Sequence, residues 1–195
     1  MQEIQSVVRR CQQGQLDAFT ALFSHYQDRV FDLACAIVRD DMAAEDVVQD
    51  TFLAVFQKID SYRGESRFDT WLTAIAVNQC RMRLRKRKIQ QVLSLEQFSA
   101  RRLFGLTGRG EDLSDVVHQR QHRQTLWDMV DQLNDRVRLP IILRYRYGLP
   151  CSDIATVLNR RTSTIYQYLN EGRRQLERMA QQQEGHIQVT LGEIR

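Results

Sequence analysis

A dense basic cluster occupies residues Arg81 to Lys88, where six of the eight side chains are arginine or lysine. Guanidinium and ammonium groups at this density bind phosphates, and aromatic rings beside them can stack on unpaired bases. Three such rings, Tyr62, Phe68 and Trp71, precede the cluster. The segment therefore predicts contact with opened nucleic acid. Two alternatives stay open, namely a charged helix end that serves only solubility, and Phe68 and Trp71 as core residues.

Two short helical patterns near the C-terminus surround a tight turn at Asn159. In the second pattern Ile165, Leu169 and Leu176 would face a core. Asparagine tolerates the left-handed backbone conformation of such a turn, so the segment predicts a helix-turn-helix. The turn and the other faces of the second helix carry side chains that can read base edges or hold phosphates: Arg160, Arg161, Thr162, Ser163, Tyr166, Gln167, Asn170, Arg173 and Arg174. Two angled helices in an ordinary all-α domain would give the same spacing.

An acidic helix is predicted between Asp41 and Ile59, with Asp40 and Asp41 available to cap it. It carries more apolar positions than one buried face requires. A second face could therefore dock a basic, apolar partner surface. The exposed residues expected on that face are Asp46, Gln49, Asp50 and Leu53.

Residues suited to catalysis or metal binding are scattered. Two of the four histidines, His118 and His122, lie four positions apart but lack an HExxH core, and the cysteines form no CxxC pair. The sequence contains neither a glycine-rich phosphate loop nor a nucleophile elbow. We therefore expect no enzyme activity, no metal and no cofactor. A metal- or thiol-dependent sensor is the rival interpretation, and it would use Cys11, Cys35, Cys80 and Cys151.

Composition and periodicity bound the architecture. The chain has 195 residues, 27% of them charged and 43% hydrophobic, with a net charge of +4, and no apolar run approaches a membrane span. Apolar residues recur at helical spacing, without strand-like alternation, so we predict an all-α, cytoplasmic protein with no direct membrane insertion. The periodicity fades after Ile89, which predicts a first domain at 1–90, a flexible linker at 91–120, a second domain at 121–180 and a tail at 181–195.

Two stretches resemble a known family. The first is AAEDVVQDTFLAVFQKIDSYRGESRFDTWLTAIAVN, followed by arginines, and it is similar to the second conserved region of bacterial sigma factors of the extracytoplasmic-function (ECF) group. The second is LNDRVRLPIILRYRYGLPCSDIATVLNRRTSTIYQYLNEGRRQL, which resembles their fourth region. Both occur in the family's order and together cover most of the chain.

The resemblance implies an alternative sigma factor that binds core RNA polymerase and directs promoter recognition, DNA melting and transcription initiation. By the same resemblance, the first stretch grips the coiled coil of the largest polymerase subunit through Asp46, Val47, Gln49, Asp50, Phe52 and Leu53. It captures a flipped base of the minus-ten element and supports the separated strand through Ser61, Tyr62, Arg63, Phe68, Trp71, Asn78, Arg81, Arg83, Arg85 and Arg87. The helix-turn-helix would read the minus-thirty-five element as duplex.

The resemblance also implies further partners, namely the polymerase flap and a cognate anti-sigma factor, which could be anchored in a membrane. The sequence departs from the family pattern at several positions. Pro150 stands where a capping serine is usual, and Tyr166, Tyr168 and Glu171 stand where Lys or Arg is common. Because Glu171 would repel phosphate, the promoter sequence does not follow from the resemblance. A stand-alone helix-turn-helix regulator, which needs no polymerase-docking face, is the alternative function.

Overall fold

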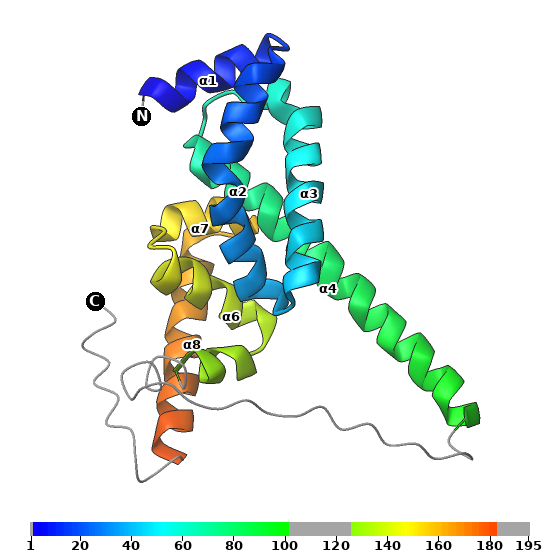
Figure 1. Ribbon diagram of the computed structural model, residues 1–195. Helices are drawn as coiled ribbons and strands as arrows, with labels where there is room; N and C mark the ends of the chain where they lie inside the picture. Colours follow the sequence, from blue (N-terminus) through cyan, green and yellow to red (C-terminus); the bar gives the residue numbers. More distant parts are fainter. Residues whose placement is uncertain (1, 102–125, 183–195) are drawn as a thin grey trace, which may run out of the picture. The chain divides into compact units, whose positions relative to one another are not determined.

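The computed structural model describes the backbone of residues 2–101 and 126–182, and every regular element within those ranges is a helix (Figure 1). Side chains are described for residues 4–90 and 126–181. The helices form two compact units, of which the first contains residues 2–101 and the second contains most of residues 126–182. The predicted all-α fold with two helical domains is confirmed. Residues 102–120 of the predicted linker and residues 183–195 of the predicted tail lie outside the described residues.

The first unit is built around its second helix, which packs against three others. Its elements are α1 (Gln2–Gln12), α2 (Leu16–Val38), α3 (Asp41–Lys58), the 3-10 turn η1 (Ile59–Ser61) and α4 (Phe68–Arg101). The apolar residues at helical spacing are the ones that become buried, and they include Leu22, Val30, Ile37, Val47, Val55, Leu72 and Val77. Burial of these side chains is the main force that holds the unit together.

The junction between α2 and α3 shows why each helix stops and starts where it does. Arg39 adopts a left-handed conformation, with φ 58°, and its N–H donates to the carbonyl oxygen of Cys35 at 3.0 Å. Asp40 then caps α3, because its carboxylate accepts from the N–H of Ala43 at 2.8 Å. Asp40 is the N-cap of α3 and Asp41 its first residue, so the predicted cap is confirmed.

Helix α4 is longer than the sequence predicts, since it continues to Arg101, inside the segment expected to be linker. Residues 91–101 contain neither proline nor glycine, the residue types that stop helices most strongly. The loss of apolar periodicity after Ile89 therefore does not mark the end of the helix.

The second unit contains a helical segment at 126–132, then α6 (Asp135–Ile141), η2 (Ile142–Arg146), α7 (Cys151–Leu158) and α8 (Thr162–Gln182). Asn134 caps α6 by accepting from the N–H of Val137 at 3.3 Å. Past Pro140 the α-helical pattern ends, and residues 142–146 are π-helical. A proline has no N–H to donate to the preceding turn, which accounts for a change of hydrogen-bond register at this point.

Helices α6 and α8 pack closely at Gly172. A Cβ atom built on Gly172 would lie 2.9 Å from Cγ1 and 3.0 Å from Cδ1 of Ile141. Both residues are buried. The glycine in the middle of α8 is therefore explained by the space available to its side chain, and its cost in helix propensity is offset by close packing.

We predict that Gly172→Leu lowers the free energy of unfolding of the second unit by about 2 kcal/mol or more, because a large side chain would displace Ile141. Gly172→Ala should change it far less, since a gain in helix propensity of about 1 kcal/mol opposes the contact. Urea unfolding followed by Trp127 fluorescence, in a Trp71→Phe background, measures both. Glu177→Leu, at an exposed position of α8, is the matched control. A Gly172→Leu protein as stable as this control would contradict the packing argument.

Candidate polymerase and nucleic-acid interfaces

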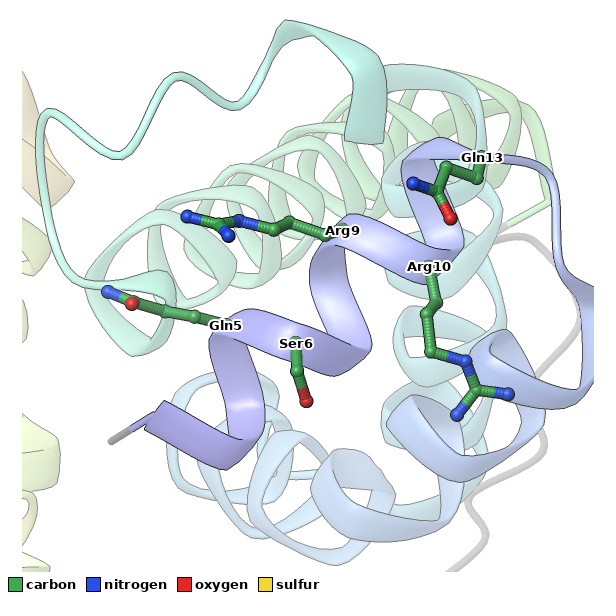
Figure 2. A pocket seen from close by; sticks show the side chains of 5 residues that line it. All are labelled: Gln5, Ser6, Arg9, Arg10 and Gln13. Atoms are coloured by element: carbon green, nitrogen blue, oxygen red, sulfur yellow. The ribbon is translucent and has the colours of Figure 1, made fainter.

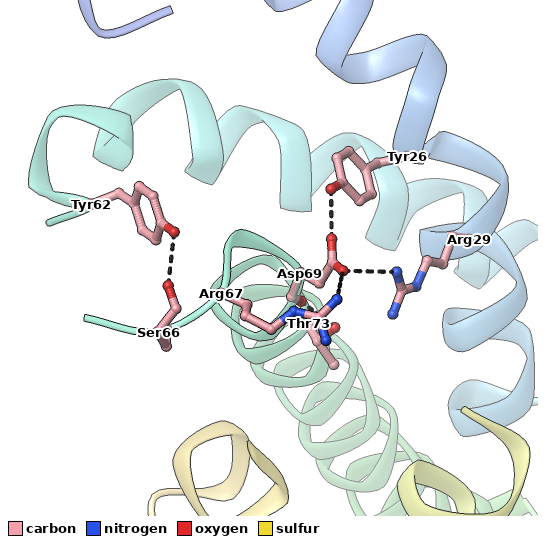
Figure 3. A network of polar contacts seen from close by, with 7 residues as sticks. All are labelled: Tyr26, Arg29, Tyr62, Ser66, Arg67, Asp69 and Thr73. Carbon is pink, nitrogen blue, oxygen red and sulfur yellow. Dashed lines mark hydrogen bonds and ion pairs between the residues drawn. The ribbon is translucent and has the colours of Figure 1, made fainter. Parts of the chain in front are cut away.

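The connection between α3 and α4, residues 62–67, is called here the α3–α4 loop. It has no regular structure, and a network of polar contacts holds it (Figure 3). The carboxylate of Asp69 accepts from the hydroxyl of Tyr26 at 2.6 Å and from Arg67 at 3.0 Å. Arg29 forms a longer ion pair with it at 3.6 Å. Asp69 thus joins α2, the end of the loop and the start of α4.

The charge state of Asp69 follows from these contacts. Burial by itself would raise the pKa of this carboxyl. The hydrogen bond from Tyr26 and the guanidinium groups of Arg29 and Arg67 outweigh burial, so the net effect lowers the pKa below its usual value. In the same contact, burial and the Asp69 carboxylate raise the pKa of Tyr26 well above its usual value. Tyr26 is therefore a neutral donor and Asp69 a charged acceptor at physiological pH.

Aromatic rings at the two ends of the loop pack against one another. The Tyr62 ring lies 5.5 Å from that of Phe68, edge to face, and 5.3 Å from that of Trp71. The Tyr62 hydroxyl donates to the carbonyl oxygen of Ser66 at 2.8 Å, which closes the loop on itself. Phe68 is only 3% exposed and also contacts Tyr26. Phe68 is thus a core residue in this structure, while Trp71 is only partly buried, and the DNA contacts of both stay predictions.

Helix α3 presents one mixed polar and apolar face to solvent. Gln49 and Asp50 are exposed, and Leu53 is 57% and Phe56 54% exposed. Phe56, which the sequence analysis missed, packs edge to face on Phe19 of α2 at 5.1 Å. Its position three residues after Leu53 was the signal that could have found it.

Two residues predicted on the polymerase-binding face are core residues instead. Val47 is 0% and Phe52 4% exposed, so neither offers a surface to a partner in this structure. They lie on the side of α3 that packs against α2 and α4, as the contact between the Phe52 and Phe23 rings shows. A motif names positions along a helix and not the face on which they lie, so Val47 and Phe52 can act on a partner only by supporting the exposed residues beside them.

The basic cluster on α4 divides into engaged and exposed side chains. Arg83 is half-buried and forms an ion pair with Asp46 of α3. Arg85 and Arg87 are exposed, and so is Asn78, which lies nearer the start of α4. The structure thus brings together one residue predicted to touch polymerase and one predicted to touch DNA, a contact across 37 positions that the sequence did not indicate.

The helix-turn-helix has the faces that the sequence predicts. Asn159 is left-handed, with φ 50°, and Ile165, Leu169 and Leu176 are at most 5% exposed. The predicted base- and phosphate-contacting residues are all exposed: Arg160, Arg161, Thr162, Ser163, Tyr166, Gln167, Asn170, Arg173 and Arg174. Gln167, Asn170 and Arg174 line one shallow groove together with Glu171, Gln175 and Arg178.

A further cation lies beside the recognition helix α8. The guanidinium carbon of Arg136, on α6, lies 4.8 Å from the centre of the Tyr168 ring. Such stacking restricts the arginine while leaving its donors available. Arg136 was missed because the contact spans two helices and has no periodic signature in the sequence.

Two of the four thiols are poorly suited to a metal- or thiol-dependent sensor. Burial raises the pKa of Cys11, and it raises that of Cys80 to about 12. Among the described residues, no group of three or more His, Cys, Asp or Glu side chains could hold a metal ion. His118 and His122 lie outside them. Within the described ranges, no helix is both long and apolar enough to cross a membrane.

Comparison with known proteins identifies both units. Residues 22–89 match Sigma-70 region 2, and residues 123–176 match Sigma-70 region 4. The chain is 30% identical to the ECF RNA polymerase sigma-E factor of Haemophilus influenzae, over 91% of this chain and 95% of that protein. It is 27% identical to ECF RNA polymerase sigma factor SigW of Bacillus subtilis, over 90% and 95%.

Solved structures share the fold. CnrH, in complex with the cytosolic domain of CnrY, matches with a TM-score of 0.65 and 18% identity, over 91% of this chain and 97% of that one. RpoE of Bartonella quintana, in complex with the anti-sigma factor NepR, matches with a TM-score of 0.60 and 21% identity, over 85% and 98%.

Two helical units that match regions 2 and 4 in order define an RNA polymerase sigma factor. This chain belongs to the ECF group of these factors and is an alternative sigma factor. A stand-alone helix-turn-helix regulator would not account for the region 2 match.

We predict that Asp69→Asn destabilises the first unit at pH 7 and that the difference from wild type shrinks below about pH 4. A carboxyl whose pKa is lowered by folding contributes stability above its unfolded pKa, and this contribution is lost as the pH falls through the folded value. Trp71 fluorescence during urea unfolding, in a Trp127→Phe background, measures the difference. Asp28→Asn, at an exposed position of α2, is the control. A destabilisation that stays constant down to pH 3 would contradict the electrostatic explanation.

Proposed function

We propose that the first unit binds core RNA polymerase and captures an unpaired promoter base, while the second unit reads the upstream duplex. The factor would catalyse no reaction itself. The observation that carries the proposal is the presence, in one compact unit, of an exposed mixed face on α3 and an anchored α3–α4 loop followed by basic residues. A protein that only binds duplex DNA has no need of either.

The polymerase-binding surface is proposed to be the exposed face of α3. Gln49 and Asp50 supply polar contacts, and Leu53 and Phe56 supply apolar area, a combination that suits a basic and apolar helical partner such as the coiled coil of the largest subunit. Val47 and Phe52 support this face from the core. Asp46 takes part only when its ion pair with Arg83 opens.

Base capture is proposed for the α3–α4 loop and the residue that precedes it. Removing a base from the stack costs on the order of a few kcal/mol, so a pocket that is already shaped loses less on binding. The base would be received by Tyr62, whose hydroxyl is bonded to Ser66, and by the exposed Ser61 and Arg63 on either side of it in the sequence. Asn78, Trp71 and the α4 arginines, including Arg81, would then hold the displaced strand.

Upstream recognition is proposed for the exposed face of α8, with Gln167 and Asn170 reading base edges and the arginines holding phosphates. Arg136, stacked on Tyr168, adds a positive charge beside α8, which offsets the negative charge that Glu171 brings to this helix. Two units on one chain bind adjacent promoter elements with an effective concentration that neither has alone.

The remaining assignments concern boundaries and partners. We propose residues 1–90 as the first domain, with α4 extending beyond it, and residues 121–180 as the second domain. The second domain would also meet the polymerase flap. A cognate anti-sigma factor is proposed because the similar solved structures include a sigma factor bound by one. The proposed site of action is the cytoplasm.

We predict that Asp50→Arg weakens binding to core polymerase by about tenfold or more, since it places a positive charge before a basic partner surface. Run-off transcription with purified core enzyme on a genomic fragment library selects a promoter, and the variant is then titrated against core on that promoter. Asp28→Arg makes the same charge change on an exposed part of α2 and should behave as wild type. If wild-type factor never joins core enzyme, the proposed function fails; if Asp50→Arg binds normally, only the docking face is misassigned.

We predict that Arg85→Ala with Arg87→Ala lowers the salt dependence of promoter-complex formation. The slope of log K against log salt should fall by up to about 0.7 for each phosphate of the single strand that the variant no longer binds. Binding to core polymerase, measured without DNA, should not change. An unaltered slope would remove these two exposed arginines from the path of the DNA.

A further inference from the structure

The beginning of the α3–α4 loop is tied to the N-terminal helix. Gln12, the last residue of α1, donates from Nε2 to the carbonyl oxygen of Ile59 at 2.9 Å and to that of Tyr62 at 3.0 Å. Ile59 begins the η1 turn, and Tyr62 follows it and closes it, since the Tyr62 N–H donates to the Ile59 oxygen at 3.1 Å. One side-chain amide therefore spans the turn from which the loop emerges.

The chemistry of this contact requires a donor. Both partners are carbonyl oxygens, so only the NH₂ group of the Gln12 side chain can face them, and its two hydrogens suffice for two bonds. The contact joins positions 47 and 50 residues apart. Val8 and Cys11, which are buried, seat α1 in the first unit and so hold Gln12 in place.

Both backbone polar groups of Tyr62 are thereby hydrogen-bonded. Gln12 binds its carbonyl oxygen, and Ile59 accepts from its N–H. Its ring contacts Phe68 and Trp71, and its hydroxyl bonds to Ser66. Residues 63–65, which are exposed, extend between these anchors with Gly64 at φ 76°. These contacts hold the Tyr62 side chain, whereas the backbone direction in which the loop leaves η1 depends on the hydrogen bonds of Gln12 and Ile59.

We propose that Gln12 is a positioning residue for base capture, which keeps the η1 turn and Tyr62 in the shape that the unpaired promoter base requires. The inference rests on the proposed function of the α3–α4 loop. Gln12 lies on α1, outside the residues 22–89 that match Sigma-70 region 2. The N-terminal helix would thus contribute to promoter opening without touching DNA.

The mechanism is preorganisation. Without the amide, the two carbonyl oxygens can bond to water, so the fold survives, but the turn is free to adopt other conformations. Base capture must then order the loop, and the cost appears as weaker binding of the captured base. Contacts to phosphates, which depend on exposed arginines, should be unaffected.

Three substitutions separate this role from general packing. Gln12→Met keeps the length of the side chain and removes both donors. Gln12→Glu places carboxylate oxygens against two carbonyl oxygens, whereas Gln12→Lys restores N–H donors at similar reach. Gln13→Met is the matched control, because Gln13 is the next residue in sequence and is exposed in the turn that follows α1 (Figure 2).

The experiment uses full-length factor in complex with core polymerase. The probe is a single-stranded oligonucleotide that carries the non-template minus-ten sequence of the promoter selected by run-off transcription. A set of probes with an abasic site at each position locates the captured base. The ratio of affinities for the intact and the abasic probe then measures base capture apart from phosphate binding, and thermal melting of each free factor measures stability.

We expect Gln12→Met and Gln12→Glu to lower this ratio by about fivefold or more, because base capture must then also order the loop. Affinity for the abasic probe, core binding and melting temperature should stay near wild type. Gln12→Lys should recover most of the ratio, and Gln13→Met should not change it.

An unchanged ratio in Gln12→Met, with wild-type discrimination intact, would overturn this inference alone. Equal reductions in affinity for both probes together with a lower melting temperature would also overturn it, because they indicate a purely structural residue. A wild-type factor that binds intact and abasic probes equally at every position would overturn base capture by the loop, and the role of Gln12 with it.

Discussion

A loop without regular hydrogen bonding can present a defined surface only if side chains hold it, and in this protein the carboxylate of Asp69 is the central anchor. Tyr26, Arg29 and Arg67 converge on it from α2 and from the loop itself. A carboxylate that is partly removed from water is stabilised by such partners, so the charge of Asp69 and the loop geometry depend on each other. The aromatic packing around Tyr62 and the starting position of α4 both follow from this arrangement.

The two proposed surfaces of the first unit share one framework. The exposed face of α3 and the basic part of α4 lie on helices that pack together, and the Asp46–Arg83 ion pair joins them directly. Each member of the pair resembles a residue that meets a different partner. The ion pair must open when either partner recruits its residue, which releases the other residue, so the two proposed surfaces are physically linked.

Sequence reasoning succeeded where the signal is local. The inner face of α8, the left-handed Asn159 and the cap at Asp40 each depend on residues within one or two turns, and all were predicted. It did not reveal which positions of α3 are buried, or which side chains make contacts between elements far apart in the sequence. Val47 and Phe52 share a motif with exposed residues but lie on the buried side of the helix. The contacts of Gln12 with the loop and of Arg136 with Tyr168 join separate elements, and no periodicity indicates them.

The burial of Cys80 affects how the factor tolerates oxidative conditions. Oxidants and alkylating agents react with the thiolate, and burial raises the pKa of Cys80 to about 12, which disfavours that form at neutral pH. Cys80 is also 0% exposed, in the middle of the packed part of α4. Peroxide that inactivates proteins with accessible thiolates would therefore spare this position, and the helix that leads into the basic cluster would keep its core contacts under such stress.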